Sequence, residues 1–198
     1  MKARLRITAD DYGYAPAYDA GILEAARAGA VDAVSAMVLR DPEPEALLAA
    51  SVSVGLHLEP LRVASLLDQW NRFESLFGTA PAYLDGHKHC HAEPGGPGLE
   101  VARLARARGV PVRSVSPRHR RLLRCQGIQT CDRLVGRMSE SEPALPEEIA
   151  AWLEGRPPPG ATEWMVHPGH AGGGSSYDRG REEDLELLLE LASRGRWR

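Results

Sequence analysis

Short apolar segments typical of strands alternate with longer segments of helical periodicity along most of the chain. The strand-like segments lie at 5–9, 34–38, 52–58, 82–84, 110–115 and 162–166. The helix-like segments between and after them lie at 16–29, 43–50, 65–77, 97–109, 146–153 and 182–192. This alternation is typical of a mainly parallel sheet covered by helices, so we expect an α/β fold. Residues 117–138 are rich in arginine, follow neither pattern and stay unassigned.

Polar side chains stand at the ends of five of these strand-like segments. The carboxyl ends of parallel strands meet at one rim, where α/β proteins place their ligand sites. We therefore expect one catalytic site that gathers side chains from distant parts of the sequence. Its candidate residues are Asp10 and Asp11, His57, Asp85 and His87, Arg113, and His167.

One carboxylate with two imidazoles makes an open site for a divalent metal ion, with room for water or substrate. Asp11, His57 and His87 would supply these three ligands. A metal ion held there lowers the pKa of bound water and polarises a carbonyl oxygen. Two adjacent carboxylates diverge where a strand runs into a loop. One of the pair can therefore bind metal while the other, Asp10, serves as general base.

Three further residues complete the expected site. His167 follows a distant strand-like segment and is a candidate general acid. Arg113 is expected to orient a carboxylate or tune its pKa. Arg113 and Asp85 are also the candidate substrate-binding residues.

The segment 83–91 contains three histidines at alternating positions. If it is extended, His87, His89 and His91 point to one side and form a three-imidazole metal site. The alternative is a polar loop whose histidines only form hydrogen bonds.

Each motif alone also has a plainer explanation. Asp10 and Asp11 would suit a turn or a helix cap, and His57, between two leucines, would suit the core. The sequence His167-Pro168-Gly169 would suit an ordinary turn. Only the combination of these motifs favours a catalytic site.

The formal net charge of −3 argues against a nucleic-acid partner, and we interpret the arginine run at 113–124 as solvated surface. No apolar run has the length of a membrane helix, and the first residues lack the apolar region of a signal peptide. Three unevenly spaced cysteines form no disulfide framework and fit a reducing compartment. We therefore expect a cytoplasmic enzyme with no membrane span. The oligomeric state stays open, a homodimer included.

Five motifs resemble those of the YdjC-like carbohydrate deacetylases, which include chitooligosaccharide deacetylase. They occur in the family's order and extend from the first strand-like segment to the last. The motifs are Ile7-Thr8-Ala9-Asp10-Asp11-Tyr12-Gly13, Gly21-Ile22-Leu23-Glu24-Ala25, Gly55-Leu56-His57-Leu58, Tyr83-Leu84-Asp85-Gly86-His87-Lys88-His89 and His167-Pro168-Gly169.

The resemblance implies an irregular (β/α) barrel in a single domain, residues 1–198. It implies removal of an N-acetyl group from an amino sugar, an oligosaccharide or a glycolipid head group. One divalent ion would bind Asp11, His57 and His87, with Asp10 as general base and, by analogy with the wider polysaccharide deacetylases, His167 as general acid. His89 and His91 then fall outside the ligand set. The family resemblance indicates Mg²⁺, whereas two imidazoles and one carboxylate favour Zn²⁺ by ligand type.

The chain differs from this family in length. Only 30 positions separate His57 from His87, where relatives carry a longer insertion. We therefore expect a reduced barrel and a small N-acetylated carbohydrate as substrate. Two alternatives stay open: a catalytically degenerate family member that binds sugar or metal, and a metal-dependent hydrolase of another amide.

Overall fold

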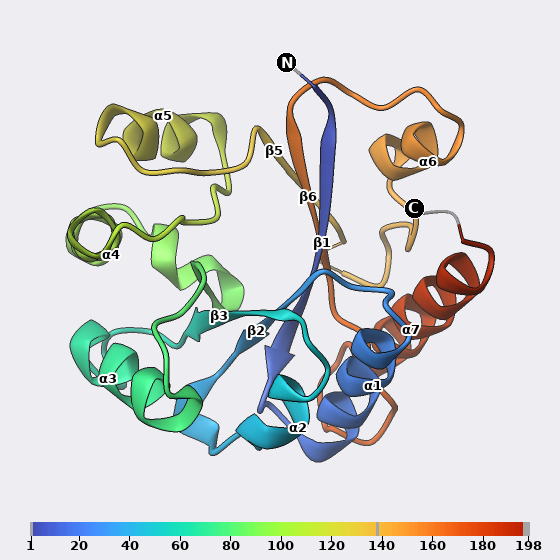
Figure 1. Cartoon of the computed structure of the whole chain (residues 1–198), viewed down its shortest axis with the longest axis horizontal. Coiled ribbons are helices and arrows are strands. Elements are labelled where there is room, and N and C mark those ends of the chain that lie inside the picture. Colours follow the sequence, from blue (N-terminus) through green and yellow to red (C-terminus); the bar gives the residue numbers. More distant parts are fainter. Residues whose placement is uncertain (1, 138, 196–198) are drawn as a thin grey trace.

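The computed structural model describes residues 2–137 and 139–195. Within them, six parallel strands form one sheet in the order β4-β3-β2-β1-β6-β5, and the sheet curls into part of a barrel (Figure 1). The expected α/β fold with a reduced barrel is therefore confirmed. The strands are β1 (Arg4–Tyr12), β2 (Ala33–Ala36), β3 (Ser53–Leu58), β4 (Leu84–Gly86), β5 (Arg133–Val135) and β6 (Ala161–Val166).

Helices surround the sheet on its outer side (Figure 1). Ser65 and Ser116 begin two of them, because each serine Oγ accepts a hydrogen bond from a backbone N–H three residues on. The helices are α1 (Pro16–Arg27), α2 (Pro44–Leu48), α3 (Leu66–Phe77), α4 (Gly96–Arg108), α5 (Pro117–Cys125), α6 (Glu147–Leu153) and α7 (Asp178–Ser193). Two short 3₁₀ helices are η1 (Val38–Arg40) and η2 (His87–Ala92). Among the described helices, none is long and apolar enough to cross a bilayer.

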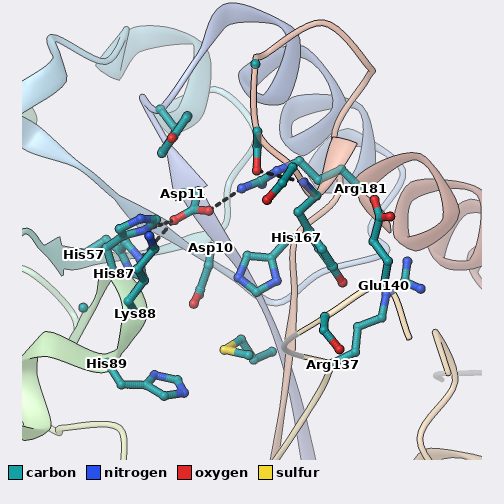
Figure 2. Close-up of a pocket in the computed structure, with 18 residues that line it drawn as sticks. Asp10, Asp11, His57, His87, Lys88, His89, Arg137, Glu140, His167 and Arg181 are labelled. Atoms are coloured by element: carbon teal, nitrogen blue, oxygen red, sulfur yellow. Dashed lines mark hydrogen bonds and ion pairs between the residues drawn. The ribbon is translucent and has the colours of Figure 1, made fainter. Parts of the chain in front are cut away.

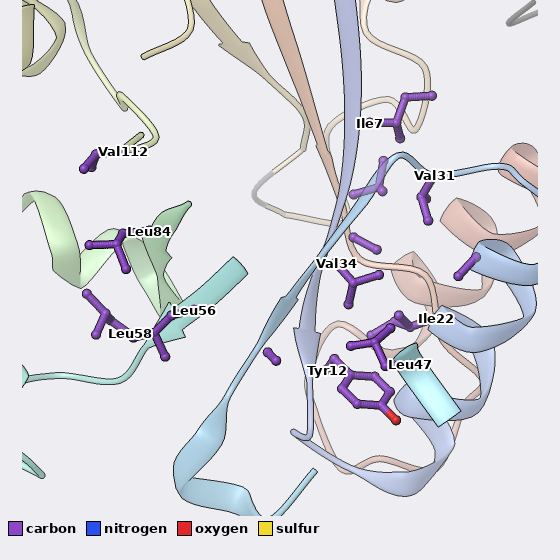
Figure 3. Packing of buried hydrophobic residues seen from close by; sticks show 14 of the residues in the cluster. Ile7, Tyr12, Ile22, Val31, Val34, Leu47, Leu56, Leu58, Leu84 and Val112 are labelled. Carbon is purple, nitrogen blue, oxygen red and sulfur yellow. The ribbon is translucent and has the colours of Figure 1, made fainter. Parts of the chain in front are cut away.

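The core lies between the sheet and the helices. Ile7 and Val34 on the two central strands are buried together with Ile22 of α1 (Figure 3). On the other side of the molecule, Trp70 and Phe73 of α3 are fully buried. Burial on this scale stabilises the framework, at about 1.5–3 kcal/mol for each large apolar side chain. The rim that carries the polar residues is therefore held by well-packed strands.

The segment expected as a fifth strand, 110–115, forms only a single bridge between Leu84 and Val112. Pro111 has no N–H to give to a ladder, which limits regular pairing. The segment still forms hydrogen bonds with β4 on one side and with the chain after α5 on the other. Arg113 N donates to Leu84 O, and Val112 N donates to Gln129 O, both at 3.0 Å. The unassigned stretch after it contains α5 and β5.

Candidate active site

A pocket of about 520 Å³ opens at the carboxyl ends of the strands (Figure 2). Carboxylates, imidazoles and cationic side chains from distant parts of the chain converge in it. Residues that line it include Asp10 and Asp11 of β1, His57 of β3, His87, Lys88 and His89 of η2, Arg137, Glu140, His167, and Arg181 of α7. Four of the five strand-end clusters expected from the sequence thus meet in one cavity.

A bulge in β1 separates the two adjacent aspartates. The strand does not end before Asp10 but continues to Tyr12, and its register with β2 shifts between Ala9 and Tyr12. Asp11 has φ 73°, in the left-handed region that non-glycine residues rarely occupy. Backbone strain of this kind is concentrated at functional sites. The bulge gives the two carboxylates different partners.

Asp11 lies at the centre of a cluster with two histidines. Its Oδ1 is 2.8 Å from Nδ1 of His87 and 3.2 Å from Nε2 of His57. Burial alone would raise the pKa of Asp11, but hydrogen bonds with His57 and His87 outweigh burial and hold it well below its usual value. Asp11 is therefore an ionised carboxylate facing two imidazole nitrogens.

Asp85 holds the second ring nitrogen of His57. Its Oδ1 is 2.8 Å from Nδ1 of His57, and its Oδ2 accepts a hydrogen bond from Ser35 Oγ at 2.7 Å. This contact fixes the ring and leaves Nε2 directed at Asp11, the arrangement that supports metal-binding histidines. Burial would lower the pKa of His57, but the charges of Asp85 and Asp10 raise it to about 10.

The donor set of Asp11, His57 and His87 fits a divalent cation. One atom from each lies within 4.8 Å of the others, and the three are buried or nearly so. Asp10, His57 and Asp85 also approach one another closely. In that second set both carboxylates bind Arg113 and only one imidazole is present. In the first set Arg181 occupies only Oδ2 of Asp11, and Oδ1 faces two imidazoles. The first set is therefore the better candidate for a metal site.

Asp10 is held by Arg113 instead. The guanidinium makes two bonds to the Asp10 carboxylate, at 2.5 and 2.8 Å, and also contacts Asp85 at 2.8 Å and Glu163 at 2.9 Å. Arg113 and Asp85 are fully buried and neither lines the pocket. Arg113 contacts Asp10 and Asp85 contacts His57, so both are better placed to position these two site residues. Substrate contact by either one stays an untested prediction.

His167 follows β6 and faces the same pocket (Figure 2). Its backbone N–H donates to Asp184 Oδ2 at 2.9 Å, and its ring Nδ1 is buried without a hydrogen-bond partner in the described part of the chain. Burial lowers the pKa of His167, although Asp11 and Asp10 oppose this shift. His170, three residues further on, is half-exposed, and its Nε2 lies 3.3 Å from Oε2 of Glu24 on the surface.

The segment 87–91 is not extended, so an alternating three-histidine face does not form. Lys88 (φ 50°) and His89 (φ 58°) adopt left-handed backbone within η2, which turns the side chains in different directions. His87 meets Asp11, and His89 lines the pocket further along (Figure 2). His91 is buried, with Nε2 3.0 Å from Arg113 O.

Arg181 is a site residue that the sequence did not reveal. Its Nη2 donates to Asp11 Oδ2 at 2.5 Å, although the two residues are 170 positions apart. In the sequence it lies directly before the charged, helix-like segment at 182–192, where an arginine usually faces solvent. Only its burial, at 3% exposed, distinguishes it from neighbours such as Arg179.

The sequence model of a family described as "YdjC-like protein" matches residues 4–60 and 63–196. The carbohydrate deacetylase of Mus musculus is 31% identical over 138 residues, which cover 48% of this chain and 44% of that protein. The chitooligosaccharide deacetylase of Enterobacter sp. (strain 638) is 30% identical over 151 residues, covering 57% of this chain and 60% of that protein. The matches thus span about half the length of these relatives.

A solved structure has a similar fold over almost the whole chain. It is an Enterococcus faecalis protein provisionally described as a cellobiose-phosphate cleavage protein. The TM-score is 0.73 with 22% identity, and the superposition covers 99% of this chain and 95% of that one. At this identity the likeness concerns the fold alone.

Proposed function

Because the chain belongs to the family of YdjC-like proteins, we propose that it is a metal-dependent hydrolase that removes an N-acetyl group from an amino sugar. The observation that carries this proposal is the division of labour at the β1 bulge. Asp11 contacts two imidazoles, while Asp10 is paired with Arg113 and faces the same pocket. A metal-ligand set beside a separate carboxylate base suits hydrolysis of an unactivated amide.

In this proposal Asp11, His57 and His87 hold one divalent ion. When bound, the ion lowers the pKa of a water molecule and polarises the acyl oxygen. Asp10 removes a proton from the attacking water. Arg113 holds the Asp10 carboxylate in place through two hydrogen bonds. His167 delivers a proton to the leaving nitrogen. One carbon–oxygen bond forms and one carbon–nitrogen bond breaks, giving acetate and a free amine.

The pocket supports a small substrate. Its volume of about 520 Å³ suits one or two sugar units better than a long chain, and the segment between β3 and η2 is short. We propose a single catalytic domain, in line with a core that is continuous between the sheet and its helices. Three free cysteines support the expected cytoplasmic location.

Acetate release tests the proposal. The protein is first stripped of metal with a chelator. It is then supplied with Mg²⁺ or Zn²⁺ and incubated with a panel of small N-acetylated sugars. We expect acetate only with metal present, and the panel decides between the two ions. His87→Ala should abolish the activity, whereas His170→Ala, which removes an exposed histidine, should retain it.

Three results would contradict the proposal. Sugar binding without acetate release would indicate a degenerate family member. Release from other amides alone would indicate a different hydrolase. Full activity in metal-free protein would exclude the metal-dependent mechanism.

A further inference from the structure

Arg181 reaches the centre of the site from α7. It is 3% exposed, lines the pocket and binds Asp11 Oδ2 through Nη2 at 2.5 Å. Figure 2 shows it approaching Asp11 from the same side of the pocket as His167. The two oxygens of Asp11 therefore have different partners: Oδ1 faces the imidazoles, and Oδ2 faces the guanidinium.

Three tyrosines surround this guanidinium. Its central carbon lies 3.9 Å from the ring centre of Tyr18, 5.9 Å from that of Tyr14 and 6.0 Å from that of Tyr177. Tyr18 is itself fixed, because its hydroxyl accepts from Ser175 N at 2.8 Å and also bonds to Asp178. Stacking of this kind holds a planar cation in one orientation. The direction of its remaining N–H groups is thus set before any ligand arrives.

Two nitrogens of Arg181 have no hydrogen-bond partner within residues 2–137 and 139–195. Nε and Nη1 are buried without a hydrogen bond to any described residue. Leaving a buried charged donor unpaired costs more free energy than a typical hydrogen bond returns, so such groups require an explanation. Arg137, which lines the same pocket, is different. Its Nε bonds to Asp184, its Nη1 to Glu183 and its Nη2 to Gly180 O.

We propose that Arg181 is the acyl-recognition residue of this site, binding the substrate's acyl oxygen and then the carboxylate of released acetate through Nε and Nη1. This inference rests on the proposed deacetylation. As the water oxygen bonds to the acyl carbon, negative charge develops on the acyl oxygen until the carbon–nitrogen bond breaks. A buried guanidinium already in place stabilises that charge without reorganisation. The planar fork also matches the two oxygens of a carboxylate.

The test compares acetate binding and turnover in Arg181→Gln, Arg181→Lys and Arg181→Ala with the wild type. Acetate binding is followed by calorimetry on metal-loaded protein, and acetate inhibition by steady-state kinetics. Metal content and circular dichroism are recorded for each variant. Arg40→Gln is the matched control. It removes the same charge from a guanidinium that stacks on Tyr14 at 4.7 Å but lies outside the pocket lining.

We expect Arg181→Gln to keep its metal, to bind acetate roughly 10- to 100-fold more weakly, and to lose kcat by a similar factor, the scale of a charged hydrogen bond. Arg181→Lys should be intermediate, since it keeps the charge without the fork. Added guanidinium ion should restore part of the activity of Arg181→Ala. Arg40→Gln should change acetate binding by less than about twofold, as expected of a surface charge.

Acetate binding within about twofold of wild type in Arg181→Gln would overturn the inference. Loss of metal in both Arg181→Gln and Arg181→Lys would also overturn it, because the residue would then serve only to hold Asp11. If the wild type releases no acetate from any sugar, the proposed function fails. The difference in acetate affinity between wild type and Arg181→Gln still decides the role of Arg181.

Discussion

Asp10 and Asp11 are chemically identical neighbours whose roles are separated by their surroundings. Asp11 lies against two imidazoles and one guanidinium, whereas the Asp10 carboxylate is bonded by Arg113. The positive φ of Asp11 lets both carboxylates face the same pocket with different partners, because a regular strand would turn the two side chains to opposite faces of the sheet. The same residue type can therefore act as ligand at one position and as base at the next.

This difference leads to opposite effects of two isosteric substitutions. Asp10→Asn should keep the metal and lose about two to four powers of ten in kcat, the scale of general base catalysis. Arg113 stays paired in that variant, because Asp85 and Glu163 remain. Asp11→Asn should lose the metal. Metal analysis beside kinetics distinguishes the two, and a metal-free Asp10→Asn protein would mean that the assignments are reversed.

The loss of rate caused by replacing His167 should depend on how strongly the leaving group requires protonation. An amine leaves only when protonated, whereas the alcohol of an activated ester departs without help. His167→Ala should thus slow amide hydrolysis by about two to four powers of ten and affect ester hydrolysis far less. Paired assays on an N-acetyl sugar and an aryl acetate measure this difference. Equal losses on both would point to a positioning role.

At the scale of elements, the turn that carries His167 is clamped between two helices. Gly169 N donates to Arg181 O of α7 at 3.2 Å, and His170 N donates to Ala17 O of α1 at 3.1 Å. α1 approaches this turn closely because Gly21 has no side chain. A Cβ there would lie 2.6 Å from Gly169 Cα, backbone against backbone. The position of His167 therefore depends on α1, a helix whose residues do not line the pocket.

Gly21→Ala should push α1 and the turn apart. We expect the free energy of unfolding to fall by about 1–3 kcal/mol, the usual cost of overpacking, and amide hydrolysis to slow with it. Gly96→Ala is the control. It adds the same methyl group to a helix where a Cβ meets no atom within 4 Å, so stability should stay within about 0.5 kcal/mol. Chemical denaturation measures both, and equal stability of the two variants would contradict the clamp.

At the scale of the whole molecule, the proposed metal site joins parts of the sheet that are far apart in sequence. Asp11 comes from β1, His57 from β3, and His87 follows β4. A ligand that binds only when all three are in place stabilises the entire fold. At 100 times its Kd, an ion adds about 2.7 kcal/mol to the free energy of unfolding. His87→Ala should abolish that gain, as measured by the metal-induced shift in Tm.

This metal-induced shift should grow with pH. The pKa of His57 in the metal-free protein is raised to about 10, so its ring is protonated at neutral pH and must release a proton to bind metal. The same proton stabilises the metal-free fold fully below pH about 6.5, and this stabilisation is lost as pH rises through about 10. Both effects increase the difference in Tm between metal-bound and metal-free protein as the pH rises from 6.5 to 8.5.

Calorimetry of metal binding checks the sign and size of this effect. One displaced proton makes the apparent association constant rise by about 100-fold over two pH units. Asp85→Asn is the control, because it removes a negative charge that raises the pKa of His57 and should therefore weaken the pH dependence of metal affinity. A constant affinity from pH 6.5 to 8.5 in the wild type would show that His57 is already neutral.

Local patterns in the sequence determined the framework of this protein. Alternating strand-like and helix-like segments predict the α/β fold, and polar residues at strand ends predict where side chains gather, because parallel strands share one rim. The same strand-end pattern predicts that Asp11, His57 and His87 lie together, as they do in the structure. The prediction of a regular strand at 110–115 was wrong, because this segment forms only a single bridge. The elements α5 and β5 were not predicted, since an arginine-rich, irregular stretch has no clear periodicity.

Only the tertiary structure decided which partners each polar group would have. The left-handed turn at Lys88 and His89 broke the expected alternation of the three histidines, since φ cannot be inferred from residue spacing. Arg113 and Asp85 became buried partners of Asp10 and His57. Arg181 entered the site because α7 packs beside α1 across the ends of the chain, and helical periodicity does not predict such a long-range contact.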